Sequence, residues 1–310
     1  MKKELFISFL CGLMAVAGAS CNHSNEPSGE TKVVKKRLLT INTQQGAESP
    51  RRIINATIND EGTTLSSLWT AGDGLSYCNL SRQEQVGVAQ YEVYQGPLTA
   101  IETKHISMVQ GDVECTVDDY LAVVYPANNT FEFISTGTKY RYHFSLAGQD
   151  GTLSGLATNY HQVYGRAHVT AVTDKTADAT MAKMQSLLTV CKFSFKDKAT
   201  NADIPVETLT IQYADATSEN GKYPQKGQVT VLVTTENHEA KAEKYDVTAP
   251  LVVTCTSEQP AVYVALMPEI ASRTYHFTVT NSEGTYSGTA SAWLKEGEYV
   301  PATGLKLIED

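Results

Sequence analysis

The sequence has few basic residues for its length, and they form no cluster interleaved with aromatic residues. Its 310 residues include 25 Lys and Arg against 34 Asp and Glu, which gives a net charge of −9 at pH 7. Nucleic-acid backbones are negatively charged and favour basic partners, so this balance argues against nucleic-acid binding. We therefore expect no nucleic acid among the partners of this protein.

Cysteine is also scarce. The chain has 6 cysteines, and no two have the C-x-x-C spacing of zinc sites and redox motifs. Two of them, Cys11 and Cys21, lie near the N-terminus, and the other four are widely separated: Cys78, Cys115, Cys191 and Cys255. This spacing is typical of buried thiols, although an oxidising compartment would allow one disulfide.

Local catalytic motifs are missing as well. The seven histidines form no H-x-x-x-H or H-E-x-x-H pair, and the chain has no G-x-S-x-G elbow and no Walker P-loop. The segment Gly72-Asp73-Gly74 lacks the third glycine of a dinucleotide loop and is typical of a turn. Asp118 and Asp119 are adjacent carboxylates, but neighbours on a strand point to opposite faces and cannot converge on one glycosidic bond. The sequence therefore predicts that the protein is not an enzyme and has no metal site or cofactor.

Only the N-terminus carries a long apolar run that could concern a membrane. Lys2 and Lys3 precede an apolar run from Phe6 to Ala17. This order is that of a cleavable secretory signal, and the run is too short for a spanning helix with proper flanks.

Small residues follow this run and end at Cys21. A cysteine directly after small residues is similar to the lipobox of bacterial lipoproteins, whose thiol is acylated, although Gly18 stands where the strongest lipoboxes carry leucine. We expect a signal peptide over residues 1–20, a lipid on Cys21 and a polar tether over residues 21–35. The alternative is an ordinary secretory signal with a chance cysteine.

The rest of the chain is dominated by short strand-like runs between Gly, Asn, Asp and Pro clusters. In Lys35 to Gln44, alternation places Leu39 and Ile41 on one face together with Arg37. Tyr120 to Pro126 is a continuous apolar run, which predicts a strand buried on both faces. Further strands are predicted at 140–146, 191–195, 209–213, 228–234, 251–256, 261–267 and 275–280, with a hairpin turn at 281–284.

One stretch, Thr176 to Leu188, has helical periodicity. Its methionine and leucine residues are spaced for one stripe, and its alanine and lysine residues have high helix propensity. The residues of the stripe are Met181, Met184, Leu187 and Leu188. This spacing predicts a short helix packed on a core, rather than a methionine surface that binds a soft ligand.

Many short strands with hardly any helix indicate an all-β protein built from antiparallel sandwiches, not a parallel α/β sheet. The mature chain is long enough for two such domains in tandem. We expect an N-terminal β-sandwich over residues 36–172 and a C-terminal β-sandwich over residues 173–310, with the break near Gly165 to Ala182.

Several segments match a family pattern in their order along nearly the whole chain. Leu68 to Leu75 has the form W-x-x-G-D, and Tyr120 to Pro126 ends in Tyr-Pro. The remaining matches are Tyr160–Ala167, Met181–Phe195, Tyr263–Pro268 and Gly297–Tyr299. Together with the lipobox, this order resembles the fimbrillin family of Bacteroidetes, the subunits of type V pili. Cys78 and Cys191 depart from the family pattern without disturbing the architecture.

The resemblance implies two transthyretin-like β-sandwich domains, with one short helix between or within them, and assembly by donor-strand exchange. An arginine-specific protease would cut after Arg51 or Arg52, in an exposed polar loop. The first strand, with Leu39 and Ile41, would then be displaced and leave an apolar groove.

A neighbouring subunit would refill that groove with its C-terminal strand. Leu305, Leu307 and Ile308 are the candidate donor residues. Two simpler interpretations stay open: a solvated arginine pair in a loop, and an ordinary last strand of the second sandwich.

The function implied is a structural pilus subunit that supports cell adhesion and polymerises with other pilus subunits. It would be held on the cell outer membrane through the lipid on Cys21, exposed at the surface, and would enter the fimbrium after processing. One alternative is a pilus anchor that does not polymerise. Another is an outer-membrane surface lipoprotein that binds glycans, with Trp69 and Trp293 as candidate stacking residues.

Overall fold

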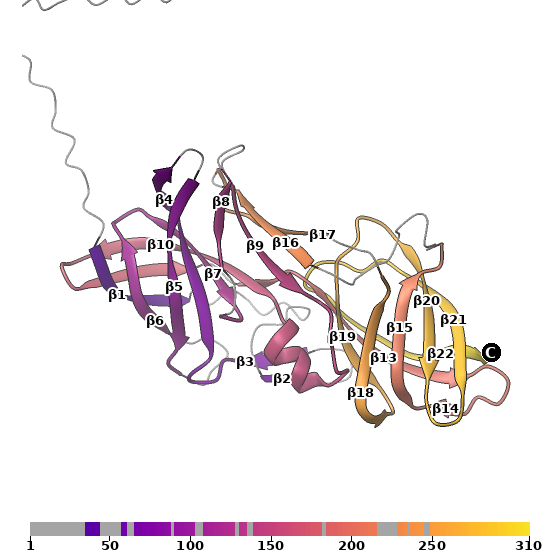
Figure 1. The fold of residues 1–310 in the computed structure, drawn as a ribbon. Helices are drawn as coiled ribbons and strands as arrows, with labels where there is room; N and C mark the ends of the chain where they lie inside the picture. Colours follow the sequence, from indigo (N-terminus) through magenta and orange to yellow (C-terminus); the bar gives the residue numbers. More distant parts are fainter. Residues whose placement is uncertain are drawn as a thin grey trace, which may run out of the picture. The chain divides into compact units, whose positions relative to one another are not determined.

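The protein is all-β apart from a short helical segment (Figure 1). The structure, a computed structural model, describes residues 35–43, 57–60, 65–87, 90–102, 108–127, 130–134, 139–181, 184–215, 228–234, 236–244 and 249–310. Helix α1, Leu153–Gly155, continues into a π-helix, η1, Leu156–Tyr160, and Thr152 caps α1 by accepting a hydrogen bond from the Gly155 amide. No helix in the described part of the chain is long and apolar enough to cross a membrane.

The first sheet closes on itself. Its eight strands are β1 (Lys35–Thr43), β4 (Gly74–Gly87), β5 (Gln90–Ala100), β6 (Val109–Cys115), β7 (Tyr120–Tyr125), β10 (Val163–Val172), β11 (Thr176–Met181) and β12 (Gln185–Ser186). They follow the order β11-β1-β6-β5-β4-β7-β10-β12, and β10 also pairs with β11. Seven of these strands therefore form a closed ring, in which β1 lies parallel to β11 and antiparallel to β6.

The second sheet is formed by the C-terminal part of the chain. Its strands are β13 (Thr189–Asp197), β14 (Asp203–Ile204), β15 (Val206–Tyr213), β18 (Leu251–Gln259), β19 (Val262–Leu266), β20 (Arg273–Thr280), β21 (Thr285–Ala292) and β22 (Tyr299–Glu309). They follow the order β14-β13-β22-β21-β20-β15-β18, and β19 also pairs with β13. The last strand, β22, lies parallel to β13 and antiparallel to β21.

A third sheet takes strands from both halves of the sequence. It has the order β17-β16-β9-β8, formed by β8 (Glu132–Ile134), β9 (Lys139–Ser145), β16 (Gln228–Thr234) and β17 (Ala240–Lys244). Alternate residues of β9 and β16, such as Tyr142 and Val231, are buried in the same cluster as Leu188 and Met267. A small separate hairpin joins β2 (Thr57–Asp60) to β3 (Leu65–Leu68).

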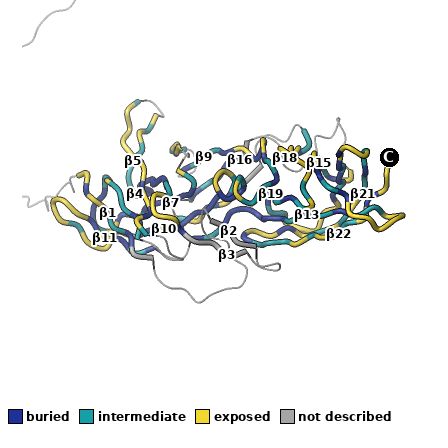
Figure 2. Tube along the Cα trace, turned by 90° about the horizontal axis from the view of Figure 1, so that it is seen from below, coloured by how far each residue is buried: buried dark blue, intermediate teal, exposed yellow. Residues whose placement is uncertain are grey.

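Buried positions recur along the strands in Figure 2, and the buried residues form three clusters. The first cluster fills the closed ring, the second packs against the third sheet, and the third packs against the second sheet. This period-2 burial follows from the strand pattern, because successive side chains point to opposite faces.

The predicted strands are confirmed, and so are the turn at Gly72 and the hairpin turn at Asn281. The predicted helix is wrong, because Thr176–Met181 is strand β11. There Ala177 and Ala179 alternate with exposed residues and are buried in the ring. Pairing with β1 and β10 has overridden the local helix propensity.

The expected division at residues 172 and 173 falls in the turn between β10 and β11, which pair with each other. The strands of the first sheet continue to Ser186, and those of the second begin at Thr189. The third sheet takes strands from both sides of this division, because β16 pairs with β9.

Candidate functional site

The first strand fills a slot between two neighbours of the closed ring. β1 pairs with β11 at six positions and with β6 at seven, so both of its edges are used. Leu39 stands opposite Ala177 and Gly111, and Ile41 opposite Ala179 and Val109. Both side chains are 0% exposed.

Leu39 and Ile41 belong to the core cluster of the ring, together with Trp69. Trp69 itself is held edge-on against Tyr125, with ring centroids 5.7 Å apart. Full burial of each aliphatic side chain contributes roughly 1.5–3 kcal/mol. The predicted inward face of the first strand is therefore confirmed, and β1 is an integral strand of this core.

A third inward residue of β1, Arg37, fastens one end of the strand. Its Nε donates to the Thr173 carbonyl over 2.7 Å, and its Nη1 donates to the carbonyls of Cys115 and Lys35. The Arg37 side chain is nearly buried, so these carbonyls replace the water that a guanidinium requires. Arg37 thus links β1 to both of its neighbours.

The turn between β10 and β11 receives two further bonds from β1. Lys35 Nζ lies 3.0 Å from Asp174 Oδ1, and the Leu38 amide donates to the Lys175 carbonyl over 3.0 Å. We call Lys35 and Arg37, with the turn 173–175 that they hold, the basic clasp. The sequence placed Arg37 on the inward face but did not show what it binds, because its partners lie more than a hundred residues away or on β6.

The other predicted residues of this region are outside the described residues. They are the lipidation residue Cys21 and the cleavage residues Arg51 and Arg52. The described part of the candidate site therefore consists of two features. These are the basic clasp and the slot, which is the space that β1 fills between β6 and β11.

The last strand lies in a slot of the same kind but is less enclosed. β22 pairs with β13 from Val190–Tyr299 to Asp197–Leu307, and with β21 only at Ser287–Ile308 and Tyr286–Glu309. Before Ile308, its other edge pairs with no strand of the described chain. The C-terminal strand thus belongs to the second sheet of its own chain, and most of one of its edges has no strand partner in the described residues.

The three predicted donor residues point to two sides of β22. Leu307 is 1% exposed and Leu305 packs partly buried against the same core, as expected for inward residues two positions apart. Ile308 is 56% exposed on the opposite face. In its own sheet, β22 therefore carries one fully buried apolar side chain.

Asp118 and Asp119 lie in a turn and not on a strand, so the prediction that strand geometry separates their side chains is wrong. Asp118 has φ +70° and is exposed, whereas Asp119 is buried. Asp119 accepts hydrogen bonds from Arg82 Nε, Asn79 Nδ2 and the Thr116 amide, over 2.8–3.0 Å. This network holds the turn to β4, and the two carboxylates do not converge.

The four remaining cysteines are buried free thiols. Burial raises the pKa of the Cys115 thiol to about 11 and that of Cys78 well above its usual value. In the described residues no group of three or more His, Cys, Asp or Glu side chains is arranged to hold a metal ion.

The two candidate stacking tryptophans differ in burial. Trp69 is buried in the ring, and Trp293 is half exposed, with its Nε1 donating to the Glu269 carbonyl over 2.9 Å and Lys295 Nζ 4.9 Å from its ring centroid. A buried Trp69 cannot stack on a glycan.

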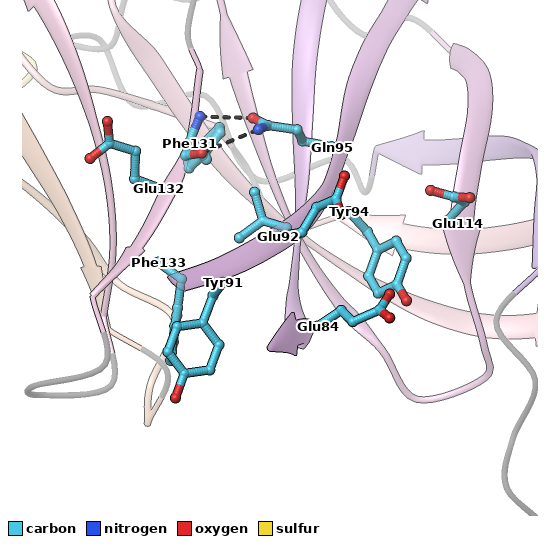
Figure 3. Close-up of a pocket in the computed structure, with 10 residues that line it drawn as sticks. Glu84, Tyr91, Glu92, Tyr94, Gln95, Glu114, Phe131, Glu132 and Phe133 are labelled. Atoms are coloured by element: carbon cyan, nitrogen blue, oxygen red, sulfur yellow. Dashed lines mark hydrogen bonds between the residues drawn. The ribbon is translucent and has the colours of Figure 1, made fainter. Parts of the chain in front are cut away.

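A pocket that the sequence did not single out lies on the outer part of β4, β5 and β8 (Figure 3). It encloses about 620 Å³. The group Tyr91, Glu92 and Tyr94 was the available signal, but the pocket depends on how β5 meets β8.

No family model matches this chain, and no curated protein matches its sequence. Among solved structures, a proposed cell adhesion protein from Bacteroides uniformis has a TM-score of 0.39 and 10% identity, covering 83% of this chain and 97% of that one. Another from Bacteroides eggerthii has a TM-score of 0.36 and 10% identity, covering 88% of each. The shaft pilin SpaA from Lactobacillus rhamnosus GG has a TM-score of 0.32 and 10% identity, covering 89% of this chain and 98% of that one. At these low scores and identities, the likeness assigns neither a fold nor a function to this chain.

Proposed function

We propose that this protein is a structural subunit of a type V pilus, built from two transthyretin-like β-sandwich domains and supporting cell adhesion. It is exported as a lipoprotein through Cys21, reaches the outer surface of the cell and is cut after Arg51 or Arg52 by an arginine-specific protease. Subunits then join by donor-strand exchange.

The observation that carries this proposal is the slot of β1. Removing β1 would leave β6 and β11 with unpaired backbone edges on either side of an apolar groove. Unpaired edges next to exposed apolar side chains are strongly unfavourable in water. A strand with two inward apolar residues would relieve both costs at once.

The last strand has features that suit this vacancy. β22 already lies between one parallel and one antiparallel neighbour, as β1 does. Its inward residues Leu305 and Leu307 have the same two-residue spacing as Leu39 and Ile41. To act as a donor, β22 would leave β13 and give up the burial of Leu307.

The proposal is tested with residues 22–310, produced without the lipid and treated with an arginine-specific protease. We expect a new N-terminus at Arg52 or Ile53, followed by concentration-dependent polymers in light scattering. The double variant Arg51→Ala/Arg52→Ala is the matched control and should stay uncut and monomeric.

A peptide experiment identifies the donor separately from the slot. A labelled peptide of residues 299–310 should bind the cut protein and not the intact one, and excess peptide of residues 35–43 should compete with it. A cut protein that stays monomeric, with the amides of β6 and β11 still protected from hydrogen exchange, would contradict the proposal.

A further inference from the structure

The pocket on β4, β5 and β8 combines carboxylates with aromatic walls. Glu84 comes from β4, Glu92 from β5 and Glu114 from β6, and Figure 3 shows Tyr94 between the carboxylates of Glu84 and Glu114. On the other side, Tyr91 and Phe133 pack edge to face with centroids 4.9 Å apart. The pocket therefore has an acidic side and an aromatic side.

The acidic side is unfavourable for the stability of the sheet. Glu84 and Glu92 stand directly opposite each other in the register of β4 and β5, and like charges at such positions destabilise a sheet. Burial raises the pKa of the Tyr94 hydroxyl, the carboxylates of Glu84, Glu114 and Glu92 raise it further, and Arg82 opposes them. All three carboxylates therefore act on Tyr94.

The neighbouring cations pair with other carboxylates. Arg82 Nε lies 2.8 Å from Asp119, and Arg141 Nε lies 2.8 Å from Glu132, which also lines the pocket beside Phe133. Lys36, which stands opposite Glu114 in the register of β1 and β6, points to Asp112 over 3.7 Å. Among the described residues, Glu84, Glu92 and Glu114 form no ion pair.

The charge of the pocket favours a cationic ligand. The carboxylates only accept hydrogen bonds, Tyr91 and Tyr94 each have one hydroxyl that can donate, and the one amide on the wall, Gln95, is bonded in both directions to the Phe131 backbone, over 3.2 and 2.8 Å. A neutral sugar would leave the charge of the carboxylates uncompensated. A lysine or arginine head group needs acceptors, and aromatic rings suit both its alkyl stem and its charge.

We propose that this pocket binds lysine or arginine side chains on an extended basic segment of a partner protein. The carboxylates of Glu84, Glu92 and Glu114 receive the charged head group, and Tyr94 stacks on it. A volume of about 620 Å³ has room for more than one side chain, so neighbouring residues of the segment contact Tyr91 and Phe133. This binding is independent of strand exchange.

The test uses the full chain from residue 22 and three probes: a short arginine-containing peptide, its glutamine counterpart, and maltohexaose. Of the three probes, we expect only the arginine peptide to show binding in calorimetry, with an affinity that falls as salt is added. Chemical shifts of Glu84, Glu92 and Tyr94 should move on binding.

Two pairs of variants separate the pocket from the general negative charge of the protein. Glu84→Gln/Glu92→Gln should weaken binding at least about tenfold, since two charge-assisted bonds are lost, and should raise the melting temperature by relieving repulsion. The control Glu207→Gln/Glu283→Gln makes the same charge change at exposed positions in the second half and should leave binding within about twofold. Tyr94→Phe should keep the affinity, and Tyr94→Leu should lower it.

Equal losses in the pocket and control variants would show that attraction is non-specific and would overturn the proposal. Binding of maltohexaose without the arginine peptide would assign the pocket to a glycan and would overturn it as well. Neither result depends on whether the protein polymerises.

Discussion

The first and last strands occupy slots of the same kind but are held differently. β1 has strand partners along both edges and buries Leu39 and Ile41 completely, whereas β22 is paired along one edge and buries only Leu307 to that degree. Strand exchange is favourable when a strand gains more stabilising free energy in its new sheet than it loses by leaving its own sheet. The deeper slot is the better acceptor, and the strand with less to lose is the better donor.

The largest difference in stability should come from truncating the two fully buried side chains of β1. Leu39→Ala/Ile41→Ala should lower the free energy of unfolding of the first sheet by roughly 4 kcal/mol or more, because each buried site costs about 2–5 kcal/mol. Leu38→Ala on the exposed face should cost within about 0.5 kcal/mol. Urea unfolding followed by hydrogen exchange on β6 and β11 measures both; an equal cost for Leu38 would show that β1 has no inward face.

A single site on β22 tests the weaker side of the comparison. Leu307→Ala should cost about 2–5 kcal/mol, whereas Ile308→Ala should cost within about 0.5 kcal/mol because its side chain faces solvent. The same denaturation experiment, followed at the Trp293 signal, reports on the second sheet. If Ile308 cost as much as Leu307, both faces of β22 would be packed, and β22 would not be the less enclosed of the two strands.

The basic clasp should add a smaller amount on the side of β1. Arg37→Met should cost about 1.5–3 kcal/mol, because the carbonyls of Thr173 and Cys115 lose a charged donor. Lys306→Met, at an exposed position on β22, should cost within about 0.5 kcal/mol. Thermal unfolding at matched pH compares them, and equal costs would remove the special role of Arg37.

The smallest contrast concerns two exposed carboxylates. Hydrogen bonding to Lys35 holds the pKa of Asp174 below its usual 3.8, whereas Asp197 is held below 3.8 chiefly by its bonds to Thr200, with Lys306 a lesser cause. Both contributions are present above the unfolded value and are lost as pH falls through the folded pKa.

We therefore expect Lys35→Ala to move the pKa of Asp174 back toward 3.8, and Lys306→Ala to change Asp197 much less. Carboxyl chemical shifts followed over pH 2 to 6, roughly the range in which these groups titrate, measure both values. An unmoved Asp174 would show that Lys35 does not pair with it in solution.

Alternation and apolar runs were enough to predict several strands and the inward face of β1, but not the long strands β4, β5 and β10. Leu39 and Ile41 could be placed from sequence because burial on a strand is a local pattern. The helix expected at Thr176–Leu188 failed because alternating alanines in β11 have weak strand propensity by themselves. Their conformation is set by pairing with β10 and with β1, and β1 lies far away in the sequence.

The parts of the sites that depend on distant contacts could not be predicted. Arg37 meets Thr173 only after β1 has paired with β11, and Glu114 on β6 approaches the β4–β5 hairpin that pairs Glu84 with Glu92 only after β6 has joined the sheet. The crossing of the two halves by the third sheet is also non-local, since β9 and β16 are separated by the whole boundary region. Length and composition favour two domains but contain no information on a sheet that takes strands from both halves of the sequence.

That third sheet has a mechanical consequence. β9 and β16 are joined by seven consecutive register pairs, from Ser145–Gln228 to Lys139–Thr234. Because the hydrogen bonds of an antiparallel pair lie across the strands, a force pulling along them loads the bonds together in shear. Tension that would slide β9 past β16 must therefore rupture the whole seam at once, whereas a peeling force would open it one bond at a time.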